Sequence, residues 1–231
     1  TGDQHRRRTL LIAALAAGIV LVAWNVPALD FALYPLRLFV TFVHESGHGL
    51  AALLTGGQFH TLSVMADGSG VATTAGGARA LILPAGYLGA ALFGAGLFAL
   101  ANLLTRARWL SAGLAALLVA LTLLYTPFVS TGFLVGLGFA AALGALAWKG
   151  NTDINRLVLI ALALLVSLTA FFDLTGLVTH SGAAMGAVRN DAAAFSAEIA
   201  PLIPAALVAL CWSGFALVLL LGAGWYALIR P

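Results

Sequence analysis

Two histidines and a glutamate form the motif H-E-x-x-H at His44, Glu45 and His48. On a helix, residues four apart lie on the same face, so both imidazoles can bind one zinc ion. The glutamate beside them can take a proton from a water molecule, as in metalloproteases. Given the 5 histidines among the 231 residues, random placement would produce this motif in about one chain in a thousand. The motif therefore predicts a hydrolytic zinc site with Glu45 as the catalytic base.

The motif lies inside an apolar run, residues 36–54, that is long enough to cross the hydrocarbon layer of a membrane. Ionisable residues in such segments are costly and most often functional. A buried carboxylate such as Glu45 would be forced toward its neutral form without a metal or another cation nearby. We therefore expect residues 36–54 to form a metal-binding helix. The alternative is that the three polar side chains only hydrogen-bond to neighbouring helices.

A third zinc ligand must come from elsewhere, because catalytic zinc usually has three protein ligands and one open position. Asp191 lies in a late polar loop, residues 179–201, and could be that ligand or could instead cap a short helix. Asp173 competes for the role, since it lies near the end of an apolar run where an unpaired carboxylate is unfavourable. His180 and His60 are further candidates.

Composition identifies the class of protein. Hydrophobic residues make up 62% of the chain, charged residues 8%, and the mean hydropathy is +1.05, so a soluble domain of this length would expose a vast apolar surface. We predict an all-α integral membrane protein, a single polytopic domain over residues 1–231, with about seven transmembrane helices and a short β-hairpin-like insertion after the second. The apolar runs are Thr9–Val26, Leu36–Leu54, Ala80–Leu104, Trp109–Thr126, Phe128–Trp148, Leu157–Val178 and Leu202–Ile229.

Charges gather at the ends of these runs. The net charge of +3 comes from short clusters and not from one basic face, so we expect the lipid bilayer as a partner and no nucleic acid. Basic residues fall on both sides of the seven expected spans, so they do not fix the orientation. Arg6–Arg8 before the first run resembles a signal peptide, although the later spans make that secondary. We expect Trp109 and Trp148 to anchor helix ends at the membrane interface, and Cys211, the one cysteine, to be a small core residue.

Residues 56–78 break the helical pattern. Side chains alternate from Phe59 to Met65, and the turn sequence Asp67–Gly70 follows, which is typical of a β-hairpin. Directly after a metal-binding helix, an exposed strand edge could hold an extended substrate peptide by main-chain hydrogen bonds. The alternative is a simple polar loop.

A site of this kind also needs water inside the bilayer. We expect a polar channel that reaches the zinc and is lined by Ser46, Thr41 and Asn190, among other residues of the hairpin and the late loop. Gly47 and Gly49, beside the histidines, would let a second backbone come close, or would serve contacts between helices.

The chain resembles the M50B branch of the site-2 protease family, which comprises intramembrane zinc metalloproteases. The resemblance is sharp from Val43 to Gly89 and around Asn190–Ala192. It is carried by residues 43–52, Thr55–Gly57, the turn Asp67–Gly70 and the segment Ala85–Gly89.

This resemblance implies cleavage of a membrane-protein substrate in or near a transmembrane segment, in a multi-pass protein that we place in the inner membrane of a bacterium. It implies zinc bound by His44, His48 and an aspartate, with Glu45 as the base. The L-D-G motif that carries the aspartate in other branches does not occur here. Asp191 instead resembles the family's S-D-A segment, with Asn190 in place of the serine, which favours it over Asp173.

Functions other than proteolysis remain as alternatives. A metal transporter or sensor would suit a bundle rich in small residues, and a catalytically silent relative could bind a transmembrane partner. Hydrolysis requires the carboxylate of Glu45, whereas transport does not. The glycine-rich faces also suit a homodimer, and the small residues concerned include Gly132, Gly136, Gly138 and Gly144.

Overall fold

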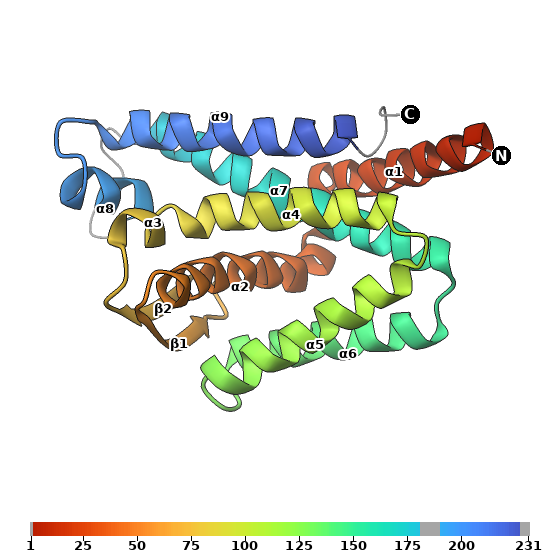
Figure 1. Ribbon diagram of the computed structural model, residues 1–231, viewed down its shortest axis with the longest axis horizontal. Coiled ribbons are helices and arrows are strands. Elements are labelled where there is room, and N and C mark those ends of the chain that lie inside the picture. Colours follow the sequence, from red (N-terminus) through yellow and green to blue (C-terminus); the bar gives the residue numbers. More distant parts are fainter. Residues whose placement is uncertain (1, 181–189, 227–231) are drawn as a thin grey trace.

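The structure is a computed structural model that describes residues 2–180 and 190–226, and most of these residues are helical (Figure 1). The elements in chain order are α1 (Gly2–Asn25), η1 (Pro27–Leu29), α2 (Asp30–Leu54), β1 (Gln58–Val64), β2 (Gly70–Ala75), α3 (Arg79–Ile82), α4 (Ala85–Leu103), α5 (Ala107–Tyr125), α6 (Thr131–Lys149), α7 (Thr152–His180), α8 (Asp191–Glu198) and α9 (Ala205–Gly224).

Within the described residues, 5 helices are long and apolar enough to cross a membrane: α4, α5, α6, α7 as far as Leu174, and α9. The expected count of seven spans is therefore not confirmed. In α1 the apolar stretch among the described side chains is Leu10–Val22. In α2 the polar residues of the H-E-x-x-H motif interrupt the apolar run. The expectation of a helical protein with a small hairpin after the motif helix agrees with the structure.

The hairpin forms as predicted, and the alternative of a polar loop is wrong. Strands β1 and β2 pair antiparallel, with Leu62 opposite Ala72 and Val64 opposite Gly70. The pairing shifts between Phe59 and Thr61, so the strict alternation expected from the sequence is broken there. This irregularity puts Phe59 on the buried face together with Leu62 and Val64. One face of the hairpin is thereby fixed against the helices.

Helix α2 lies among the hairpin, α4 and α6 (Figure 1). Phe39 is fully buried and stacks on Phe139 of α6, with ring centroids 4.4 Å apart. A side chain at Gly47 would overlap the carbonyl oxygen of Ala85, and one at Gly49 would overlap the ring of Phe59. Gly47 therefore lets the backbone at the start of α4 come close to α2, whereas Gly49 makes room for a ring of the hairpin and not for another helix.

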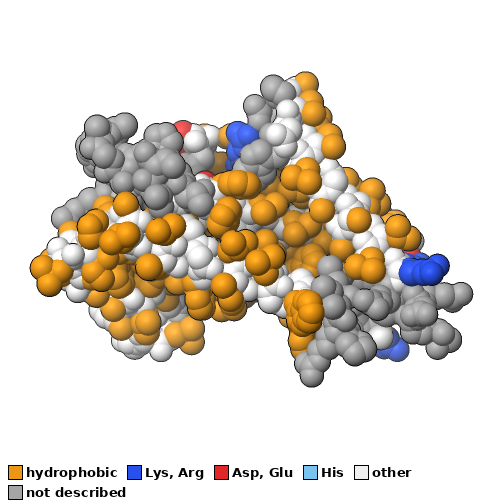
Figure 2. All heavy atoms as spheres, turned by 90° about the horizontal axis from the view of Figure 1, so that it is seen from above, with side chains coloured by type: hydrophobic (Ala, Val, Ile, Leu, Met, Phe, Trp, Pro, Cys, Tyr) orange, Lys and Arg blue, Asp and Glu red, His pale blue; other side chains and the backbone are white. Residues whose placement is uncertain are grey.

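The outer surface is largely hydrophobic, as Figure 2 shows for one face of the molecule. Trp109 and Trp148 are 61% and 87% exposed, and the guanidinium carbon of Arg108 lies 5.2 Å from the Trp109 ring centroid, so their predicted interfacial role is compatible with their positions. Cys211 is exposed, so its assignment to the core was wrong. Helix α9 is apolar on all sides, and such a helix gives no sequence signal for the face that packs inward.

Candidate metal centre

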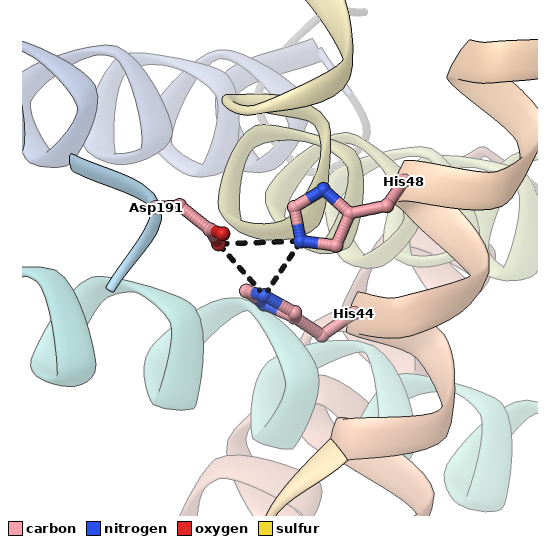
Figure 3. A group of neighbouring side chains, drawn as sticks. All are labelled: His44, His48 and Asp191. Carbon is pink, nitrogen blue, oxygen red and sulfur yellow. Dashed lines mark hydrogen bonds and ion pairs between the residues drawn. The ribbon is translucent and has the colours of Figure 1, made fainter. Parts of the chain in front are cut away.

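Three side chains from α2 and α8 meet at one point (Figure 3). His44 Nε2 and His48 Nε2 lie 3.1 Å apart, and Asp191 Oδ2 lies 3.1 Å from the first and 3.2 Å from the second. In a tetrahedral zinc site with bonds of about 2.0–2.1 Å, the ligand atoms are roughly 3.3–3.4 Å apart. Among the described residues, these three are the ones whose ligand atoms lie close enough together to hold a metal ion.

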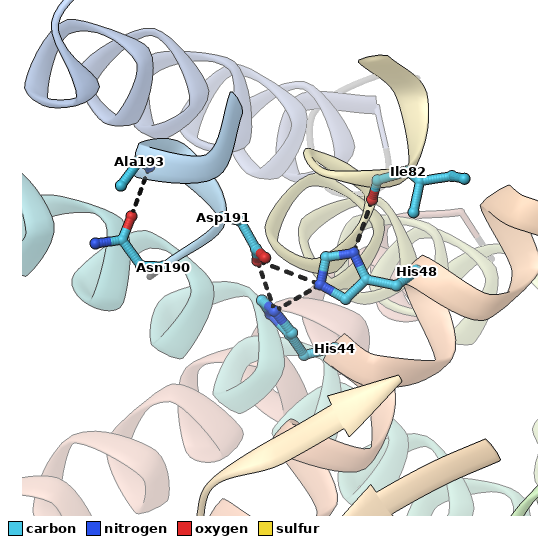
Figure 4. A network of polar contacts seen from close by, with 6 residues as sticks. All are labelled: His44, His48, Ile82, Asn190, Asp191 and Ala193. Carbon is cyan, nitrogen blue, oxygen red and sulfur yellow. Dashed lines mark hydrogen bonds and ion pairs between the residues drawn. The ribbon is translucent and has the colours of Figure 1, made fainter. Parts of the chain in front are cut away.

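The hydrogen bond that His48 makes on its far side indicates that a positive charge is needed between these atoms. Its Nδ1 lies 2.7 Å from the carbonyl oxygen of Ile82, which can only accept a hydrogen bond, so Nδ1 is the donor (Figure 4). In a neutral imidazole, Nε2 then carries a lone pair that is directed at the Asp191 carboxylate. A second proton on the ring or a metal ion relieves this repulsion. Because a ligating histidine usually donates its other N–H in this way, the residues present fit a metal ion.

Helix α8 begins at the residue that completes the cluster. The side chain of Asn190 accepts a hydrogen bond of 2.8 Å from the backbone N–H of Ala193, which makes Asn190 the N-cap (Figure 4). The capping role considered for Asp191 therefore belongs to its neighbour, and the Asp191 carboxylate is directed at the histidines. At the other end of α8, Glu198 accepts two hydrogen bonds from Arg79 of α3, at 3.0 and 2.7 Å.

The surroundings of Asp191 favour its charged form. Burial raises the pKa of its carboxyl group, but hydrogen bonds and charge interactions with His44 and His48 lower it by more, so the pKa lies well below its usual range. The carboxylate is therefore ionised and can balance a cation.

Glu45 lies beside the cluster with only 7% of its surface exposed. It is close enough to interact electrostatically with all three donors, and the backbone N–H of Ala72 in β2 interacts with its carboxylate. The hairpin comes this close because residue 70 is glycine: a Cβ at Gly70 would lie 2.8 Å from Glu45 Oε1. Strand β2 thus runs directly alongside Glu45.

Two hydrogen bonds hold the hairpin turn against α2. Thr41 Oγ1 donates to the Gly68 carbonyl at 2.8 Å, and the Tyr34 hydroxyl donates to the Ala66 carbonyl at 2.6 Å. Because both helix residues lie N-terminal to Glu45 on α2, they fix where β2 begins relative to that carboxylate.

The other candidates lie elsewhere. Asp173 on α7 interacts electrostatically with His44 but does not belong to the converging group. His60 is an exposed residue of β1, and the side chain of His180 falls outside the described residues. Ser46 donates a hydrogen bond to the Phe42 carbonyl and borders an apolar groove between α2, α4 and α5, so its assignment to a polar channel was wrong.

Three neighbours of the histidines were missed in the sequence: the Ile82 carbonyl, Gly86 and Tyr87. The Tyr87 ring packs edge-on against His44, with centroids 4.5 Å apart. Gly86 and Tyr87 belong to a segment that supported the family resemblance, but neither spacing nor residue type gave them a role.

Comparison with known proteins gives one match. A family model described as Peptidase M50B-like matches residues 11–223, which is most of the chain. No match was found among curated proteins or among solved structures. The chain therefore belongs to the M50B-like peptidases, a branch of the site-2 protease family.

Proposed function

We propose that this protein is a zinc metalloendopeptidase that hydrolyses a peptide bond in or near a transmembrane segment of a membrane-protein substrate. The observation that carries the proposal is the convergence of His44, His48 and Asp191 on one point, with the carboxylate of Glu45 beside them. Membership of a peptidase family supports the same class of reaction.

His44, His48 and Asp191 would hold the zinc ion, with two neutral imidazoles and one carboxylate as ligands. Zinc in such a site supplies Lewis acidity, which polarises a peptide carbonyl and lowers the pKa of a water molecule toward neutrality. Asp173 lies outside this group and is not proposed as a ligand.

Glu45 would act as the general base and then as the general acid. Its carboxylate takes a proton from the attacking water and returns it to the amine of the leaving peptide. Burial keeps bulk water from competing for this proton, and the N–H of Ala72 orients the carboxylate.

We further propose that the substrate binds as an extended strand along β2. In the two-stranded sheet, β1 occupies one edge of β2, and no strand among the described residues pairs with the other edge. Main-chain hydrogen bonds along that edge would hold the substrate backbone extended, so that its carbonyl groups are exposed to attack. Because Gly70 and Ala72 lie beside Glu45, the bound segment would pass close to the base.

The five apolar helices and the family support a multi-pass membrane protein. We propose the inner membrane of a bacterium as its location, a membrane-protein substrate as its partner and a homodimer as its assembly.

Metal content and peptide cleavage measured on the same preparation test the proposed function. The full chain is purified in detergent, and its zinc content is measured by elemental analysis for the wild type, His44→Ala and Glu45→Gln. Each sample is then reconstituted with a panel of single-span membrane peptides, and the products are identified by mass spectrometry. We expect about one zinc per chain in the wild type and in Glu45→Gln, loss of zinc in His44→Ala, and cleavage by the wild type alone.

A wild-type protein without zinc would overturn the proposal. Bound zinc together with equal function of the wild type and Glu45→Gln would instead favour a metal transporter or sensor, because only hydrolysis needs the carboxylate.

A further inference from the structure

We infer that Gly86 is a positioning residue for the metal centre: its missing side chain leaves room for the two imidazoles to converge, and the corner Ile82–Tyr87 around it orients both rings. This inference rests on the proposed function, since it concerns the same zinc site. The corner consists of the last residue of α3, the first three residues of α4 and the two residues between them.

The position of the missing side chain carries the inference. A Cβ built on Gly86 would overlap the Nε2 atoms of both His44 and His48. The next nearest atom is Cε1 of the same His44 ring, so a side chain at position 86 would push against both rings where their Nε2 atoms converge. The backbone of α4 therefore covers the site at a position where any side chain would displace the two imidazoles.

The same corner fixes the two rings. The Ile82 carbonyl accepts the Nδ1 proton of His48 at 2.7 Å, which directs Nε2 of that ring toward the cluster. The Tyr87 ring packs at 82° to the His44 ring and limits its rotation. His44 and His48 are thus oriented by residues on either side of Gly86.

A second glycine allows the corner to reach α2. Gly47 lies between the histidines in the motif, and a side chain there would overlap the Ala85 carbonyl oxygen. With glycine at position 47, Ala85 can rest directly on α2, and this contact brings Gly86 above the two nitrogens.

Replacement of Gly86 by alanine separates metal binding from folding. The three nearest atoms that a new methyl group would meet lie at the far ends of two side chains, which are displaced from their present contacts more easily than the backbone is moved. The fold is then kept and the ligand geometry is lost. Loss of partners that only orient ligands weakens metal binding by about 10–100-fold, so we expect displacement of the ligands themselves to weaken it by about 100-fold or more.

The test compares Gly86→Ala with Gly89→Ala, one turn further along α4. A Cβ at Gly89 would meet only the Gly47 Cα, at 3.5 Å, which is an ordinary contact. The readouts are zinc affinity by competition with a chelator, the absorption spectrum of the cobalt-substituted protein, and helix content by circular dichroism. We expect Gly89→Ala to match the wild type, and Gly86→Ala to keep its helix content but lose zinc binding and the cobalt spectrum.

Gly86→Ala that binds zinc as tightly as the wild type overturns this inference alone, while the proposed function stands. A wild type that binds no zinc overturns both.

A measurement without metal covers the case in which Gly86→Ala folds poorly. The three nearest atoms all belong to the two imidazoles, so destabilisation of the zinc-free chain should largely vanish in a background of His44→Ala and His48→Ala. If Gly86→Ala destabilises the zinc-free chain just as much in that background, the new methyl group must clash with atoms other than the two imidazoles. That result would overturn the inference.

Discussion

The N-cap of α8 offers a test of how the third donor is held in place. Asn190 accepts a hydrogen bond of 2.8 Å from the N–H of Ala193, and Asp191 is the first residue of the helix that this bond begins. Asn190→Ala removes the cap without touching the cluster. Loss of such a cap costs about 1 kcal/mol, within a range of about 0.5–2 kcal/mol.

This cost sets the size of the expected effect. If the first turn of α8 unwinds, Asp191 no longer points at the histidines, and the apparent affinity falls with the fraction of molecules that are competent to bind. If the first turn is marginal without zinc, a cost of about 1 kcal/mol lowers the zinc affinity by up to about fivefold, and a cost of about 2 kcal/mol by up to about 30-fold. Overall unfolding should change little, because α8 has only 8 residues.

Zinc affinity is measured by competition with a chromophoric chelator, on the full chain in detergent. Asn190→Ser is the matched control, since serine is also a good N-cap and should keep nearly the wild-type affinity. Equal affinities for Asn190→Ala and the wild type would show that the cap does not hold Asp191. Equal losses in the alanine and serine variants would show that Asn190 acts other than by capping.

Three further predictions concern the site and its support. Asp191→Asn should lose zinc while Asp173→Asn keeps it, as elemental analysis of both purified variants would show; the reverse result would move the site to α7. Gly70→Ala should push Glu45 aside and lower kcat by about 100-fold with the zinc content unchanged, so a loss of zinc in that variant would contradict the role given to β2. Arg156 is buried and donates to two carbonyls at the end of α4, at 2.9 and 3.1 Å. Arg156→Ala should therefore lower the free energy of unfolding by about 1–3 kcal/mol, measured by denaturation in detergent, and an unchanged value would refute its supporting role.

The local features could be predicted because their causes are local. His44 and His48 share a face through the four-residue spacing within one helix. The hairpin follows from alternating side chains and the turn Asp67–Gly70, although the irregularity at His60 left no sequence signal. The start of α8 follows from Asn190, a residue type that favours the N-cap position.

Predictions about which side of a helix faces inward were less reliable. Cys211 and Ser46 both lie in apolar runs, and both were assigned to the wrong surroundings. In a soluble protein, polar residues mark the outer face of a helix. In a lipid environment the outer face is apolar as well, so hydrophobicity does not distinguish it from the core. The number of spans was hard to predict for a related reason. Helix α2 carries the polar residues of the motif inside an apolar run, so the run alone does not show whether the helix is apolar enough to be counted as a span.

The sequence by itself was enough to predict the type of chemistry, because the motif places the two proposed ligands and the proposed base within five residues of one helix. It left two aspartates as candidates for the third ligand, because a linear sequence does not give the distance in space between His44 and a residue 147 positions away. Only the tertiary structure brought Asp191 to the histidines, through the packing of α8 on α9 and the ion pair from Arg79. Only the tertiary structure placed Gly86 over the site, because a close approach between two backbones depends on how two helices pack against each other.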